Sequence, residues 1–222
     1  MIPIMFYHNR RGGMKNLFAI FLIILFSFAA NAYELKNGDL IFQIEDNGDF
    51  SQAISKSTSF DDSLSFVHVG IIEVKNNDDI VVIEASPKNG VCITPLEAFL
   101  KESPFIDGKP GVVVKRLNIN FPVKETIKKA KSHLGEDYDW WYLPDNGKMY
   151  CSELIYESYR DVNNKPLFEA KPMNFRNSDG SMPEFWINLF KKLNQPVPEG
   201  VPGTNPQDLA KDKNLIEIHR FF

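Results

Sequence analysis

Two strongly β-forming segments, joined by five polar residues, restrict the fold of this chain more than any other feature. Residues 66–74 read FVHVGIIEV and residues 80–85 read IVVIEA, with KNNDD between them. Valine, isoleucine and phenylalanine favour strands, and a short polar connection between two such runs is typical of a hairpin. The pattern therefore predicts a pair of adjacent antiparallel strands.

This hairpin brings a histidine and a glutamate to the same face of the sheet. One register pairs Val74 with Ile80, and the other is tighter by one residue pair. His68 is diagonal to Glu84 in the first register and directly opposite it in the second. In either case the carboxylate can fix the imidazole tautomer and stabilise its charged form. Gly70 lies on the same face and leaves open space beside the histidine.

A helix that begins near a cysteine is predicted over residues 150–160, YCSELIYESYR. The unpaired N–H groups at a helix start carry partial positive charge, which favours the nucleophilic thiolate and can hold an oxyanion. A pair of Cys151 with His68 is one interpretation. The alternatives are a small core cysteine and a satisfied core histidine. One buried stripe is formed by Cys151, Leu154, Ile155 and Ser158.

Shorter patterns predict the remaining elements. Strands are expected at residues 40–44 and 112–117, and helices at residues 51–57 and 122–134. A capping box, Ser181-x-x-Glu184, predicts a further helix that ends at about residue 193. The proline-rich residues 194–205 are expected to form an extended loop.

Composition excludes several classes of protein. The chain has 25 Lys and Arg against 29 Asp and Glu, a net charge of -4 that argues against binding nucleic acid through a basic surface. Cys92 and Cys151 are too few for a disulfide scaffold or a four-cysteine zinc site, although a single disulfide between them is an alternative to a free nucleophile. The sequence contains no phosphate-binding loop and no dinucleotide fingerprint, so we expect no cofactor and no metal.

Residues 1–32 have the pattern of a targeting segment. They contain no acidic residue, and the apolar run LFAIFLIILFSF at 17–28 is followed by Ala30-Asn31-Ala32. This is typical of a signal peptide that starts at Met14, after an upstream extension, and is cleaved after Ala32. Twelve apolar residues are short for a membrane span of about 20. We therefore expect an exported protein without a membrane span after cleavage, located in the periplasm, in the cell envelope or outside the cell, with one domain over residues 33–222.

Four short motifs occur in a fixed order: GDLIFQ at 38–43, SFVHVGII at 65–72, VIEA at 82–85 and YCSEL at 150–154. Together they resemble the YiiX/YebB-like group of circularly permuted papain-like hydrolases, which belong to the NlpC-type superfamily. PEFW at 183–186 and GTNPQDL at 203–209 add to this resemblance. The histidine precedes the cysteine, as a permuted chain requires.

The resemblance implies an α+β fold in which an antiparallel sheet packs on helices and the nucleophile lies at a helix N-terminus. It implies that Cys151 is the nucleophile, that His68 is the general base and that Glu84 orients the imidazole. The expected reaction is hydrolysis of an amide, or of an ester, in an envelope substrate such as a cell-wall peptide or an acyl-lipid. The alternative is a catalytically weak module on the same fold that binds a lipid or another envelope ligand.

Two further residues are candidates for contact with the substrate. Tyr138 lies ahead of the cysteine and is a candidate second oxyanion donor, and Gly70 is a candidate substrate contact. The aromatic run at residues 140–142 is expected to form either core or a wall for the substrate.

Overall fold

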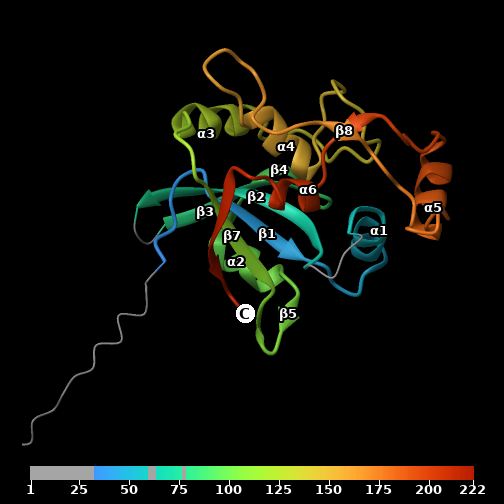
Figure 1. Cartoon of the computed structure of the whole chain (residues 1–222), viewed down its shortest axis with the longest axis horizontal. Helices are drawn as coiled ribbons and strands as arrows, with labels where there is room; N and C mark the ends of the chain where they lie inside the picture. The colour runs from blue at the N-terminus through green and yellow to red at the C-terminus, as the bar shows by residue number, and fades with distance from the viewer. Residues whose placement is uncertain (1–32, 60–63, 77–78) are drawn as a thin grey trace, which may run out of the picture. The chain divides into compact units, whose positions relative to one another are not determined.

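The computed structural model describes residues 33–59, 64–76 and 79–222, so the predicted signal peptide and its upstream extension lie outside the described residues. A six-stranded antiparallel sheet with the strand order β10-β7-β1-β2-β3-β4 forms the centre of the domain (Figure 1). Its strands are β1 (Leu40–Ile44), β2 (Phe66–Asn76), β3 (Asp79–Ser86), β4 (Gly90–Pro95), β7 (Val112–Leu117) and β10 (Leu215–Arg220).

The predicted hairpin forms strands β2 and β3. Val74 lies opposite Ile80, and Gly70 lies opposite Glu84. His68 lies two residues before Gly70 in β2 and is therefore diagonal to Glu84. This is the first of the two registers expected from the sequence.

Helices cover both faces of the sheet (Figure 1). On one side lie α3 (Val123–Ser132) and α4 (Cys151–Ser158), and on the other lies α2 (Leu96–Glu102). This arrangement of helices on an antiparallel sheet is the α+β architecture predicted from the sequence. None of the helices in the described part of the chain combines the length and the apolar character needed to cross a bilayer.

Two apolar cores result, because side chains alternate between the faces of a strand. Val69 and Ile71 of β2 face the first core, where they are buried together with Leu154 of α4. Ile72 faces the second core, where Phe99 of α2 is buried. Full burial of each such side chain stabilises the folded protein by about 1.5–3 kcal/mol relative to exposure. The hairpin is thus held from both sides, which fixes the position of the residues that it carries.

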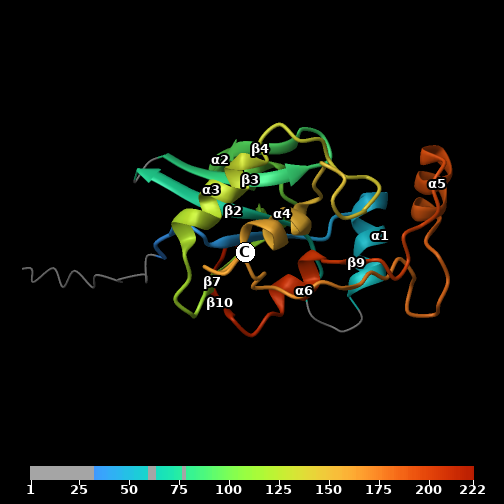
Figure 2. The same ribbon diagram turned by 90° about the horizontal axis from the view of Figure 1, so that it is seen from above.

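The other elements surround one end of the sheet. Helices α1 (Asp49–Thr58) and α5 (Glu184–Leu193) lie side by side there (Figures 1 and 2). The remaining elements are the short pairs β5 (Phe105–Ile106) with β6 (Lys109–Pro110) and β8 (Lys171–Pro172) with β9 (Pro202–Gly203), and helix α6 (Pro206–Ala210).

Two details differ from the expectations. The capping box at Ser181 is wrong: α5 begins after Pro183, and the Ser181 hydroxyl donates to Asp179 Oδ1 at 2.5 Å. The hydroxyl oxygen accepts the side-chain N–H of Asn177 at 2.8 Å instead of a backbone N–H of the helix. The expected loop at 194–205 contains β9, which pairs with β8 and ties this segment to the body of the domain.

Candidate functional site

Cys151 is the first residue of α4 and is 4% exposed. The first turn of the helix is held by Glu153, whose Oε2 accepts the backbone N–H of Tyr150 at 3.4 Å. Leu154, Ile155 and Ser158 are buried, as the predicted stripe requires. The thiol is therefore fixed at a helix start, where free N–H groups favour negative charge.

His68 follows a bulge in strand β2. Gln43 of β1 pairs with His68, whereas its neighbour Ile44 pairs with Phe66, so that Val67 is the extra residue. A bulge bends its strand and changes the direction of nearby side chains, and bulges are common beside active sites. The histidine is thus placed directly after an irregularity near the beginning of its strand.

Three side chains from neighbouring strands form a hydrogen-bonded chain. His68 Nε2 lies 2.5 Å from Glu84 Oε2, and Glu84 Oε1 accepts the Thr94 hydroxyl at 2.5 Å. The Cys151 thiol lies close enough to the imidazole to raise the pKa of His68. Because Nε2 is bonded to the glutamate, Nδ1 is the ring nitrogen left for the sulfur. Phe99 of α2 stacks on the histidine, with ring centroids 5.9 Å apart.

The electrostatics favour a charged histidine. Burial alone lowers the pKa of His68, but its interactions with Cys151 and Glu84 outweigh burial and raise that pKa to about 10. Burial raises the pKa of Glu84, but the bonds from His68 and Thr94 leave this pKa lowered overall. An imidazolium held by a carboxylate is therefore the stable state at neutral pH.

Tyr138 lies in the connection between α3 and α4. It forms an isolated bridge with Met149, and burial raises the pKa of its phenol well above the ordinary value, so that the hydroxyl keeps its proton. The buried carboxylate of Asp139 accepts the backbone N–H groups of Trp141 and Leu143, each at 2.9 Å. This turn fixes the tyrosine beside the site.

Two cavities meet at Ile54, Val67 and Tyr138, which line both of them. The cysteine cavity, with a volume of about 60 Å³, contains Cys151 and is walled by aromatic side chains. The histidine cavity, with a volume of about 260 Å³, contains His68 and Glu84 and has polar groups at its rim. The cysteine cavity is lined by Tyr138, Tyr142, Tyr150, Met173, Phe175 and Trp186, among others.

The sequence also singled out Gly70 and the aromatic run at residues 140–142 as candidates for contact with the substrate. Gly70 lies inside the sheet opposite Glu84, where an added Cβ would clash with the side chain of Val82. Val82 therefore fills the space that the sequence left open beside Gly70, and a contact of Gly70 with the substrate stays a prediction. Within the aromatic run, Tyr142 lines the cysteine cavity, whereas Trp141 is 37% exposed.

The alternative of a disulfide between the two cysteines is wrong, since both are free thiols. Cys92 lies in β4, directly opposite Glu84. Its Sγ is 3.9 Å from the Ser86 hydroxyl and 3.8 Å from the Thr94 hydroxyl.

Sequence reasoning missed several residues of the site. Thr94 supports Glu84, Phe99 stacks on His68, and Phe175 and Trp186 wall the cysteine cavity. A signal existed only for Thr94, which lies in a strand-like run with Cys92. The aromatic residues come from helices and loops that are distant in sequence, so no local pattern connects them with the site.

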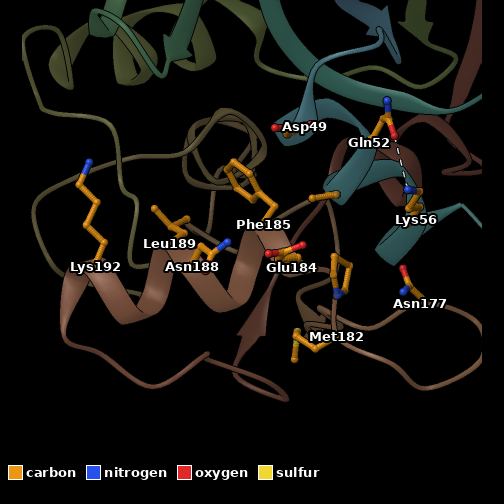
Figure 3. A pocket seen from close by; sticks show the side chains of 12 residues that line it. Asp49, Gln52, Lys56, Asn177, Met182, Glu184, Phe185, Asn188, Leu189 and Lys192 are labelled. Carbon is orange, nitrogen blue, oxygen red and sulfur yellow. Dashed lines mark hydrogen bonds between the residues drawn. The ribbon is translucent and has the colours of Figure 1, made fainter.

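A larger cavity lies elsewhere in the described part of the chain. It has a volume of about 820 Å³ and lies between α1 and α5, where Lys56 and Gln52 face Glu184 and Phe185 (Figure 3). Its lining contains neither the cysteine nor the histidine, so size alone does not identify the reactive site.

Comparisons with known proteins agree with this geometry. Residues 34–219 match the family described as "Permuted papain-like amidase enzyme, YaeF/YiiX, C92 family". The chain is 28% identical over 209 residues to the uncharacterized protein YiiX of Escherichia coli strain K12, covering 92% of this chain and 96% of that protein.

A solved structure is similar as well. It is the crystal structure of YiiX from Escherichia coli O157:H7, whose title calls that protein a metalloprotein. The TM-score is 0.65 at 25% identity, and the match covers 83% of this chain and 97% of that one. The sheet, the helix that begins at a cysteine and the family match lead to one conclusion: this chain belongs to the permuted papain-like amidases, a family of cysteine hydrolases.

Proposed function

We propose that the protein hydrolyses an amide bond with Cys151 as nucleophile, His68 as general base and acid, and Glu84 as the group that orients the imidazole. One observation carries this proposal: the imidazole of His68 is bonded to the carboxylate of Glu84 at 2.5 Å and lies near enough to the thiol at the start of α4 for that thiol to raise its pKa. A nucleophile, a base and an orienting group in that order are the elements of acyl transfer.

The reaction has two halves. The thiolate of Cys151 attacks the carbonyl carbon, and the C–N bond then breaks as the amine takes a proton from His68. This leaves a thioester on the sulfur. His68 next takes a proton from water, the hydroxide attacks the thioester, and the carboxylic acid leaves as the thiolate is restored.

The developing oxyanion needs donors. The backbone N–H of Cys151, at the first position of α4, is the first of these in our proposal. The hydroxyl of Tyr138 is the second, because it lines the cavity of the cysteine and keeps its proton. A hydroxyl with a raised pKa remains a donor across the physiological pH range.

We further propose that the substrate belongs to the cell envelope, as a cell-wall peptide or an acyl-lipid. The support is the signal-peptide pattern of residues 1–32, which predicts export.

The name of the related crystal structure raises the question of a metal. Within residues 33–59, 64–76 and 79–222, no three His, Cys, Asp or Glu side chains gather as metal ligands, so the steps above use only the protein's own groups.

The test is turnover of amides by the purified protein, with trapping of the thioester. We expect hydrolysis of N-acyl amides and a mass increase on Cys151 equal to the acyl group. Cys151→Ala removes both signals, and Cys92→Ala is the matched control that keeps them. Hydrolysis that survives Cys151→Ala would contradict the proposal.

Export is tested separately, by sequencing the N-terminus of the protein isolated from the cell-envelope fraction. We expect Tyr33 as its first residue.

A further inference from the structure

The two cavities of the site differ in volume by about fourfold, with about 60 Å³ beside the cysteine and about 260 Å³ beside the histidine. We propose that this difference divides the substrate: the cysteine cavity takes a short apolar acyl group, and the histidine cavity takes a larger polar amine. This inference rests on the proposed function, and it names the class of amide that the site selects.

The chemistry fixes which part of the substrate lies in which cavity. The acyl group becomes bonded to Cys151 Sγ, so its chain must enter the space that contains the sulfur. The departing amine takes its proton from His68, so it must lie in the space that contains the imidazole. Val67 and Tyr138 line both spaces, and the scissile bond would lie between them.

The volume limits the length of the acyl chain. A cavity of roughly 150 Å³ holds one benzene molecule. The cysteine cavity has less than half of that volume, which leaves room for an acyl group of about two to four carbons. A long lipid chain exceeds this space and would extend beyond it.

The wall of this cavity is built to resist movement. Tyr142, Phe175 and Trp186 pack edge to face, with centroids 5.7 Å, 5.7 Å and 5.2 Å apart. Each ring therefore blocks the direction in which another could turn. Trp186 Nε1 donates to the Ser57 hydroxyl of α1 at 3.3 Å, which fixes the largest ring to a second helix.

The histidine cavity has a different character. Asp46, Lys88 and Glu102 are exposed and line it, so both signs of charge occur at its rim. Such a surface suits a polar amine that keeps part of its contact with water, such as the amino group of an amino acid or a peptide.

The experiment varies one half of the substrate at a time. In the first series, one fluorogenic amine, aminomethylcoumarin, carries an acetyl, butanoyl, octanoyl or hexadecanoyl group. We expect kcat/KM for the acetyl and butanoyl amides to exceed that for the octanoyl amide by about tenfold or more. In a second series, acetyl amides of ammonia, alanine and a dipeptide should lose no activity as the amine grows.

Changes to the wall connect the preference with the cavity. Trp186→Ala should shift the optimum to the octanoyl amide, and Trp186→Phe should shift it less while disturbing packing less. Trp141→Ala, which removes an exposed tryptophan, should leave the preference unchanged. Alkylation of Cys151 by iodoacetamide at the wild-type rate checks that each variant keeps its site.

The two proposals fail in different ways. A wild-type preference for the hexadecanoyl amide, or a preference that Trp186→Ala leaves unchanged, would overturn the division of the substrate while leaving the amidase intact. If no amide in either series is hydrolysed in a manner that depends on Cys151, the proposed function itself is wrong, and the division is wrong with it.

Discussion

Cys151 and Cys92 are the two thiols of the chain, and both lie close to the same hydrogen-bonded chain of side chains. Cys151 begins α4 and lies near the imidazole of His68, whereas Cys92 lies mid-strand beside the hydroxyls of Ser86 and Thr94. A hydroxyl is not a base at neutral pH, and a strand lacks the partial positive charge of a helix start. A nucleophile thus needs more than a position near the site: it needs a base and a helix start.

The largest expected effect comes from removing each thiol in turn. Cys151→Ala should lower kcat/KM for amide hydrolysis by about 10⁴-fold or more, because the covalent route is lost. Cys92→Ala should remain within about threefold of wild type, since this thiol has no base. Steady-state kinetics of both variants measure the contrast, and equal losses in the two would remove the distinction between the cysteines.

Removing the orienting carboxylate should have the next largest effect. Glu84→Gln keeps the size of the side chain but removes the charge that stabilises the imidazolium, and we expect a loss of about 10²–10⁴-fold in kcat. Cys92→Ser, at the position directly opposite Glu84, controls for disturbance of the strand pair. A Glu84→Gln variant with wild-type kcat would show that the imidazole needs no orienting partner.

The charge of His68 should also appear in the stability of the fold. Its pKa in the folded protein is about 10, above the ordinary value of about 6.5. A raised pKa stabilises the fold fully below the unfolded value, and this stabilisation is lost as the pH rises through the folded value. The free energy of unfolding of wild type relative to His68→Ala should therefore fall between about pH 6.5 and pH 10. Denaturant titrations of both proteins at pH 6, 8 and 10 measure the difference, and a difference that grows with pH would have the wrong sign.

The smallest effect is expected at the residue that supports the glutamate. Thr94→Val removes a hydrogen bond to a charged group, worth about 1.5–3 kcal/mol, and should raise the pKa of Glu84 and lower kcat by about tenfold. Thr94→Ser keeps the hydroxyl and is the matched control. If both variants match wild type over the whole pH profile of kcat, the bond has no part in holding the carboxylate.

The sequence predicted the part of the site that depends on short-range pairing. Val74 and Ile80 flank a short polar turn, and this alone fixes which residues of the hairpin share a face with His68. The helix at Cys151 was recognised for a similar reason, since its buried stripe is local. Both elements carry strong periodicity, which is the most reliable signal in a sequence.

The walls of the site could not be predicted in this way. Phe99, Phe175 and Trp186 reach the site through the packing of α2, the 171–177 segment and α5, which no local pattern connects. The capping box failed because the Ser181 hydroxyl oxygen accepts from the side chain of Asn177, a contact that the spacing of capping residues does not describe. Local sequence patterns therefore do not predict the walls that would contact the substrate, because these walls form through tertiary contacts.

The most direct test of the central claim is the rate at which iodoacetamide alkylates each cysteine, read separately by mass spectrometry in wild type and in His68→Ala. If His68 holds Cys151 as a thiolate, Cys151 should react faster than Cys92 at pH 6 despite its burial, and His68→Ala should abolish that advantage. A Cys151 that reacts no faster than Cys92, or whose rate does not change in His68→Ala, would contradict the claim that these two residues form the reactive pair.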